Sequence, residues 1–259
     1  MRITLELDQS VEENASAYFE RAKKAKRKQQ GAREALAETQ KLLAKETQKT
    51  ALAEQRATRT PPPKHWYHKY RWSKTRNGHL LVAGQNASAN EVLIKHHTQE
   101  EDLVFHTDMA GSPFTILKPE GGVMEEDLFD AAVFTASYSK AWSKGLASLD
   151  VFYVKPHQVT KQAQAGEYLA KGSFMIRGET TYLSAPLELG VGVIVREGVL
   201  PEVFVGSKES CAQHTHTFAL LIPGDQKTSD VAKQLRKRFD ADLNDLVRAI
   251  PAGNSKIRI

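Results

Sequence analysis

The sequence predicts an α+β protein, with a mixed or antiparallel sheet domain and flanking helices preceded by a long N-terminal coiled-coil helix. Three observations predict it: a basic stretch without proline up to residue 60, three consecutive prolines at 61–63, and a following series of short strand-like and helical runs. The 259 residues suffice for one large domain with an appendage. We divide the chain into a basic coiled-coil helix (1–60), a central domain (61–188) and a C-terminal α/β continuation of that domain (189–259).

The N-terminal segment reads as one helix. Ser10 followed by Glu13 fits a capping box. Apolar and small residues then alternate four and three apart, which predicts a thin heptad seam. The seam consists of Tyr18, Ala22, Ala25, Gln29, Ala32, Leu36, Thr39 and Leu43. A helix of this length cannot bury the seam alone, so it needs a partner helix, either in a homodimer or in a missing N-terminal half.

The positive charge of the chain is concentrated in this helix. The formal net charge is +5 overall, whereas residues 14–60 hold twelve Lys and Arg against five Asp and Glu. A basic segment favours a polyanionic partner, of which RNA is the usual one, and it is also compatible with a solubilising helix face. The single cysteine excludes an internal disulfide, and neither a signal peptide nor a membrane-spanning run is evident, which predicts a cytoplasmic protein without a membrane partner.

After the prolines, strand-like and helical runs follow one another. "HLLVAG" and "EVLIKHH" read as strands joined by the turn-forming "GQNASAN", and "DLVFHTD", "PFTILK", "LDVFYVKP" and "GSFMIRG" read as further strands. "EEDLFDAAVFTASYSKAW" has helical spacing. In the tail, "VGVIVRE", "PEVFVGS" and "TFALLIPG" predict strands, and two short helices follow at about 229–239 and 242–250.

Residues 64–79 interleave aromatic and basic side chains and contain no acid. Such rings can stack on bases while the cations contact phosphates. Alternatively, the rings lie in the core and the cations in water, and we favour the core for at least two of Trp66, Tyr70 and Trp72.

Residues with catalytic or metal-binding potential form only short patterns. His106 and Asp108 would share a strand face, which is compatible with acid–base chemistry but more typical of a hydrogen-bonded turn. Cys211, His214 and His216 offer three zinc ligands without a fourth at the usual spacing. Nucleotide-binding and hydrolase motifs are missing from the sequence. We therefore expect no enzyme, no metal and no cofactor.

Residues 158–178, "QVTKQAQAGEYLAKGSFMIRG", combine many hydrogen-bonding side chains with three glycines. This composition suits a surface that fits a shaped polar object, and equally an ordinary loop. The motif resembles the long Q-V-S-K…G-E-Y-L-x-x-G-S-F-M-I-R-G signature of the NFACT-R domain. "WYHKYRW", "GQNASANE", "DLVFHTDMAG" and "SYSKAW" resemble further signatures of that domain in the same order.

The resemblance covers residues 64–185, and the N-terminal helix resembles the coiled-coil arm that precedes this domain in NFACT proteins. It implies an RNA-binding module of a ribosome-associated quality-control factor. Such factors bind the obstructed large ribosomal subunit and recruit tRNA, and the ribosome then extends the stalled chain with a C-terminal tail. The resemblance leads us to expect an archaeal-like member that lacks the family's NFACT-N and helix-hairpin-helix regions. Gln85 and Asn86 replace the usual Arg and Asp. Bacterial relatives carry a fibronectin-binding label.

The resemblance also selects candidate residues. Candidate RNA contacts are Lys69, Arg71, Lys161, Glu167, Tyr168, Lys171, Ser173 and Arg177. Motif positions of unassigned role are Asn90, Glu91, His106, Asp108, Gly111 and Gln158. The implied partners are rRNA of the large subunit, tRNA and the partner helix. The alternative function is a protein-interaction or dimerisation scaffold that acts through the coiled coil.

Overall fold

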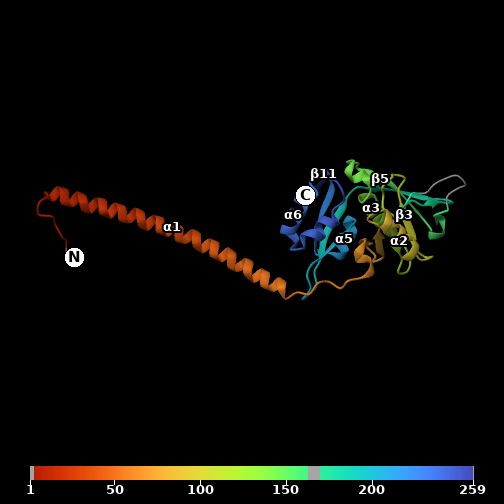
Figure 1. Ribbon diagram of the computed structural model, residues 1–259, viewed down its shortest axis with the longest axis horizontal. Helices are drawn as coiled ribbons and strands as arrows, with labels where there is room; N and C mark the ends of the chain where they lie inside the picture. The colour runs from red at the N-terminus through yellow and green to blue at the C-terminus, as the bar shows by residue number, and fades with distance from the viewer. Residues whose placement is uncertain (1–2, 163–169, 259) are drawn as a thin grey trace. The chain divides into compact units, whose positions relative to one another are not determined.

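The computed structural model describes residues 3–162 and 170–258 and separates the chain into two compact units, 1–59 and 60–259. This agrees with the predicted α+β class, since a long helix precedes antiparallel sheets with flanking helices. Of the described residues, no helix is both long enough and apolar enough to cross a membrane. Figure 1 traces the elements of each unit.

The first unit consists of helix α1, Val11–Ala57, with a short segment before it. The predicted capping box is confirmed, because the Glu13 amide donates to Ser10 Oγ at 3.2 Å and the Ser10 amide donates to Glu13 Oε2 at 2.8 Å. Figure 1 shows α1 as one continuous helix. Its predicted seam is exposed within the single chain, at 38% for Tyr18, 61% for Leu36 and 67% for Leu43.

The second unit contains a six-stranded antiparallel sheet in the order β1-β2-β4-β3-β5-β8. Its strands are β1 (Arg71–Lys74), β2 (Leu80–Ala83), β3 (Leu103–His106), β4 (Thr115–Lys118), β5 (Ser148–Val154) and β8 (Thr181–Pro186). The 3-10 helix η1 (Trp66–Lys69) precedes it, and the inserted elements are α2 (Ala87–His96), α3 (Glu125–Ser137), α4 (Lys140–Ser143), η2 (Pro156–Gln158), β6 (Val159–Thr160) and β7 (Met175–Ile176).

The C-terminal part of this unit forms a four-stranded antiparallel sheet in the order β10-β9-β11-β12. The strands are β9 (Leu189–Ile194), β10 (Glu202–Gly206), β11 (Thr217–Gln226) and β12 (Ser255–Arg258), and the helices are α5 (Lys208–His214), α6 (Thr228–Phe239) and α7 (Leu243–Ala249). The three strands and two helices predicted for this region are confirmed, whereas α5 and β12 were not predicted.

The prediction of a strand at "EVLIKHH" is wrong, because these residues form most of α2. Asn86 caps this helix, accepting a hydrogen bond from the Ala89 amide at 2.9 Å, so the stretch predicted as a turn starts a helix. Asn90 and Leu93, three residues apart, are buried, while Val92 is exposed. The burial thus follows the helical period and not the strand alternation.

Helix α3 lies at the centre of the main core. It contacts strands of both sheets, and Ala131, Ala132, Val133 and Phe134 are almost completely buried. The same core includes Leu81 and Phe105 from the first sheet and Leu189, Val231 and Leu235 from the C-terminal part. Residues on both sides of the predicted boundary at 188 therefore share one core.

A buried carboxylate also joins the two parts of this unit. Asp130 on α3 accepts hydrogen bonds from the Arg76 amide and guanidinium, each at 2.7 Å, and from Ser207 Oγ at 2.6 Å. Arg76 follows β1 and Ser207 caps α5, so one side chain ties the first sheet to the second. Because a buried charge is costly unless it is paired, this network fixes the relative positions of its elements.

Candidate RNA interface

The described ends of the polar motif 158–178 pair as two short antiparallel strands, which we call the hairpin. β6 and β7 pair with Val159 opposite Ile176 and Thr160 opposite Met175, and residues 163–169 lie outside the described part of the chain. Gln158 holds the base of the hairpin, because its Nε2 donates to the carbonyls of Arg177 at 2.9 Å and Glu179 at 2.8 Å. Its Oε1 accepts from the Lys155 amide at 2.8 Å. The structure thus places Gln158 in a positioning role.

The hairpin docks against the first turns of α2. Glu91 Oε1 accepts hydrogen bonds from Lys161 Nζ and, at 3.0 Å, from the Gly172 amide. The hydrogen bond from Lys161, and then that from Gly172, lower the pKa of Glu91. Gly172 has a φ of +80°, and a Cβ there would lie 2.5 Å from the Ala87 Cα. The two backbones approach so closely that the docking requires glycine at this position.

A row of aromatic rings continues the docking surface into the core. Lys161 Nζ lies 4.9 Å from the centroid of Phe174, and the Phe174 ring meets Phe114 edge-on at 5.1 Å. Phe114 stacks on His106 with centroids 4.0 Å apart. The hairpin is therefore fixed by an ion pair, a backbone contact and ring packing together.

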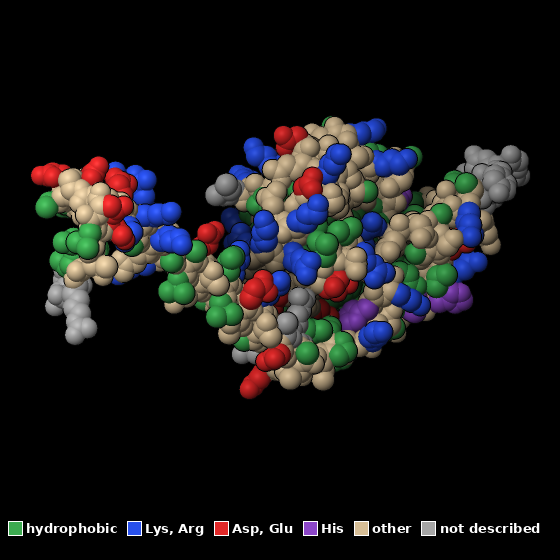
Figure 2. Space-filling model, turned by 60° about the vertical axis from the view of Figure 1, so that its left-hand side comes forward, with side chains coloured by type: hydrophobic (Ala, Val, Ile, Leu, Met, Phe, Trp, Pro, Cys, Tyr) green, Lys and Arg blue, Asp and Glu red, His purple; other side chains and the backbone are tan. Residues whose placement is uncertain are grey.

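Among the candidate RNA contacts, Lys69, Lys171, Ser173 and Arg177 are exposed. One guanidinium nitrogen of Arg177 donates to the Gln162 carbonyl at 3.3 Å. Glu167 and Tyr168 lie outside the described residues. Figure 2 shows Lys and Arg side chains spread over the visible face and interspersed with acidic ones. On this face, selective contact with a polyanion therefore depends on the local placement of the cations.

Two of the predicted RNA contacts, Lys161 and Arg71, are less accessible to solvent. Lys161 is half-buried and paired with Glu91, so its charge is already compensated within the protein. Arg71 is half-buried, and its guanidinium lies 4.6 Å from the centroid of the Tyr138 ring. Burial lowers the pKa of Arg71. Both positions favour packing and positioning over direct phosphate contact.

The remaining motif positions shape the strand ends. Asn90 is buried beside Gly84, and its Oδ1 accepts from the Phe114 amide at 3.4 Å. Gly111 has a φ of +88° in the turn before β4, a backbone conformation that residues other than glycine rarely adopt. These residues shape the ends of β2 and β3 beside Phe114, which the Phe174 ring of the hairpin contacts.

His106 and Asp108 have separate hydrogen-bond partners. His106 Nδ1 lies 2.9 Å from the Pro113 carbonyl, and burial lowers the pKa of this imidazole. Exposed Asp108 accepts from the Tyr182 hydroxyl at 3.1 Å. The arrangement matches the predicted hydrogen-bonded turn more closely than an acid–base pair.

The other short pattern is also dispersed. Cys211 is buried on α5, where burial raises the pKa of its thiol, and His214 Nε2 lies 2.7 Å from the Thr75 carbonyl. His216 is exposed. His214 thus helps to join the C-terminal part to the turn after β1.

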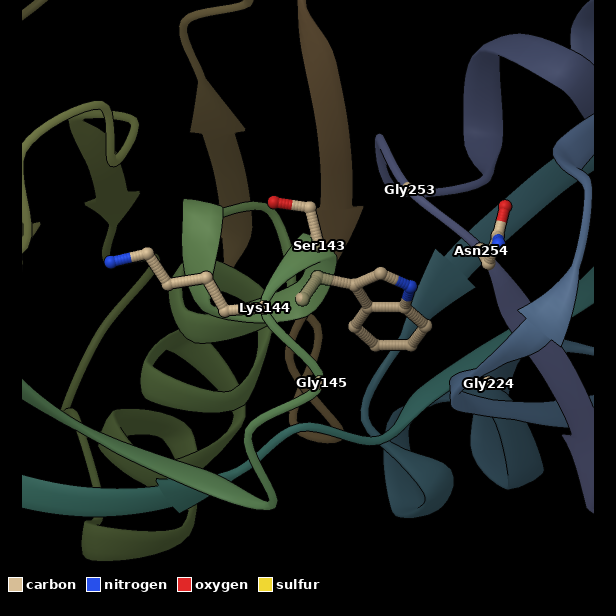
Figure 3. A pocket seen from close by; sticks show the side chains of 7 residues that line it. Ser143, Lys144, Gly145, Gly224, Gly253 and Asn254 are labelled. Carbon is tan, nitrogen blue, oxygen red and sulfur yellow. The ribbon is translucent and has the colours of Figure 1, made fainter.

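A pocket of about 380 Å³ lies between the end of α4, Gly224 on β11 and the two residues that precede β12 (Figure 3). Three glycines and Lys144 contribute to its lining, and Trp142 forms its wall, donating from Nε1 to Ser255 Oγ at 3.1 Å. Lys144 is the one charged side chain of the lining. None of the candidate residues lines this pocket, so it is separate from the hairpin site.

Sequence reasoning assigned Gly172 and Phe174 to the fold but did not identify the partners that they contact, Ala87 and Phe114. Phe114, Phe174 and Ala87 contribute to docking without any polar signature. Gly172 was a detectable signal, because glycine in a polar motif often marks a close approach, but its neighbour was not identifiable from the sequence.

Comparison with known proteins identifies a domain family and relatives of this chain. Residues 69–178 match the family model described as NFACT protein RNA binding domain. The archaeal Rqc2 homolog aRqcH of Methanocaldococcus jannaschii is 40% identical over 197 residues, which are 74% of this chain and 29% of that protein. The ribosome quality control complex subunit NEMF of Homo sapiens is 30% identical over 174 residues, 66% of this chain and 16% of that protein.

A solved structure also resembles part of the chain. The C-terminal region of the fibronectin/fibrinogen-binding protein of Streptococcus suis is 20% identical, with a TM-score of 0.40, over 48% of this chain and 47% of that one. This score is too low to establish a shared fold. The domain match and the archaeal and animal relatives define an NFACT-R module with a preceding helix, and the chain belongs to the NFACT family. It spans less than a third of the length of the relatives described.

Proposed function

We propose that this chain is the RNA-binding module of a cytoplasmic ribosome quality-control factor. In this role it binds the obstructed large ribosomal subunit and tRNA while stalled nascent chains receive C-terminal tails. The observation that carries the proposal is the match of residues 69–178 to the RNA-binding domain of NFACT proteins. The names of the archaeal and animal relatives support the ribosomal context. The module acts by binding and not as an enzyme.

The exposed cations of the candidate interface supply the contacts. Lys171 and Arg177 lie on the hairpin, and Lys69 lies at the end of η1. Phosphate contacts of this kind recognise the shape of folded RNA without reading much sequence. Since the hairpin is fixed through Glu91 and Gly172, its two cations are held on an ordered support, which lowers the entropy lost on binding.

Cosedimentation with purified large ribosomal subunits tests the proposal. We expect Lys171→Ala combined with Arg177→Ala to weaken binding about tenfold or more and to leave the free energy of unfolding nearly unchanged, because both side chains are exposed. The matched control removes two exposed lysines elsewhere, Lys208 on α5 and Lys237 on α6. Equal binding by the wild type and the hairpin variant would contradict the proposed interface.

A second candidate function is a protein-interaction or dimerisation scaffold. The exposed apolar side chains of α1 favour it: besides the predicted seam, Phe19 is 77% exposed. A helix with an unpartnered seam gains stability by packing against another helix. Sedimentation equilibrium of the chain distinguishes the two roles. A dimer that Leu36→Glu with Leu43→Glu dissociates, together with unchanged subunit binding, would support a scaffold in addition to RNA binding.

A further inference from the structure

An exposed aromatic platform lies at the junction of η1 and the end of α2. The rings of Trp66 and His97 stack face to face, with centroids 4.3 Å apart and planes inclined by 9°. Trp66 is 40% exposed, in contrast to Trp142, which is buried. Trp66 also precedes the residues matched by the family model, 69–178. The sequence favoured the core for at least two of Trp66, Tyr70 and Trp72; Tyr70 is buried and Trp72 is half-buried, so Trp66 is the exposed ring of the three.

The rings of Trp66 and His97 are held in place by packing against Tyr70 on the core side. The buried Tyr70 ring meets Trp66 edge-on at 6.2 Å and His97 at 5.8 Å. Tyr70 packs in a core cluster with Val82 and Leu93, and the His97 amide donates to the Leu93 carbonyl at 3.0 Å. The rings are thus ordered before any ligand arrives, which reduces the entropy that stacking would otherwise cost.

The surroundings of the platform are cationic. Lys69 Nζ lies 5.1 Å from the centroid of the Tyr70 ring, and exposed Lys95 and His96 end α2 next to His97. Besides burial, the charges that lower the pKa of His97 are all cationic: Lys69, Lys118 and His96. Of the two lysines, Lys118 is paired with Asp102 at 2.7 Å, whereas Lys69 is exposed. An anionic ligand with an aromatic face is complementary to this site.

We infer that Trp66 and His97 form a stacking platform for an unpaired RNA base, with Lys69 contacting the adjacent phosphate. The inference rests on the proposed RNA-binding function and adds a site for single-stranded RNA to it. An aromatic ring accepts any base, because each base has a π-face, whereas bases within a duplex are already stacked on both sides. The platform therefore selects loops, bulges or ends of an RNA and does not read a particular sequence.

Fluorescence anisotropy with labelled single-stranded oligoadenylate, and with a blunt RNA duplex of the same length, tests the inference. Trp66→Ala is expected to weaken single-strand binding about 5- to 150-fold, the range for loss of one stacked base, and to leave duplex binding unchanged. Trp66→Phe retains an aromatic face and keeps most of the affinity. Because Trp66 carries no charge, the salt dependence stays unchanged, whereas Lys69→Ala lowers its slope by about 0.7 for single strands.

The outcomes separate this inference from the proposed function. If the wild type binds large ribosomal subunits, and Trp66→Ala binds the single strand as tightly as the wild type, the platform is refuted and the proposed function stands. Binding of subunits without binding of the single strand also refutes the platform alone. An equal loss on single strand and duplex assigns Trp66 to folding and overturns the inference. A wild type that binds neither subunits nor oligonucleotides overturns both.

Discussion

The close approach of the hairpin to α2 makes Gly172→Ala the sharpest test of how the candidate interface is built. At a φ of +80°, an alanine pays about 1 kcal/mol for the left-handed conformation. Its Cβ would also lie 2.5 Å from both Cα and Cβ of Ala87, so one of two backbones must move. Forcing a methyl group into such a packed site costs about 1–3 kcal/mol. The docked hairpin is therefore destabilised by about 2–4 kcal/mol in total.

Gly198→Ala is the matched control. Gly198 has a φ of +69° and no heavy atom within 4 Å of a Cβ, so it isolates the backbone strain from the clash. The assay is hydrogen exchange at the hairpin, where the Arg177 amide donates to the Gln158 carbonyl at 2.9 Å. We expect Gly172→Ala to accelerate this exchange about 30- to 900-fold and Gly198→Ala to leave it unchanged. Equal protection of the hairpin in the wild type and Gly172→Ala would refute the docking described.

Two further predictions concern the folding stability of the second unit, residues 60–259. Asp130→Asn should lower the free energy of unfolding by about 1.5–3 kcal/mol, because the Arg76 guanidinium loses its buried charged partner. Urea denaturation measures this free energy, and Asp225→Asn, a substitution at an exposed position, is the control. Burial is the largest cause that lowers the pKa of His68, His97 and His106. As the pH falls below the ordinary pKa of about 6.5, the unfolded state binds more protons than the folded state, so stability is fully present above that pH and falls as the pH decreases below it. His106→Phe should flatten that decrease, and an unchanged pH profile in the variant would contradict the assignment.

Local signals in the sequence were sufficient for α1 and for most strands. The capping box at Ser10 and Glu13 depends on residues three apart, and the apolar runs of β2, β3 and β4 are short and bounded by turn residues. The same local reasoning failed at α2, because the three consecutive apolar residues Val92, Leu93 and Ile94 are also typical of a strand, and the residues that pack against them are not evident from the sequence. The Asn86 cap and the burial of Leu93 decide for a helix.

The candidate site was only partly predictable, because its geometry depends on distant residues. The motif identified Lys161, Glu91 and Gln158, but their hydrogen bonds place them in the support of the hairpin and not on its exposed face. Similarly, Arg76, Asp130 and Ser207 converge from three separate segments. Periodicity describes one element at a time, so it cannot indicate such long-range partners.

The measurement that tests the central claim most directly is binding of the chain to large ribosomal subunits from about 50 to 300 mM salt. Each phosphate contact should contribute a slope of about 0.7–0.9 to a linear fall of log affinity with log salt concentration. We predict a slope that corresponds to several contacts and that decreases when Lys171 and Arg177 are replaced by alanine. Absent binding across this range, or binding that does not change with salt, would contradict an RNA-binding module.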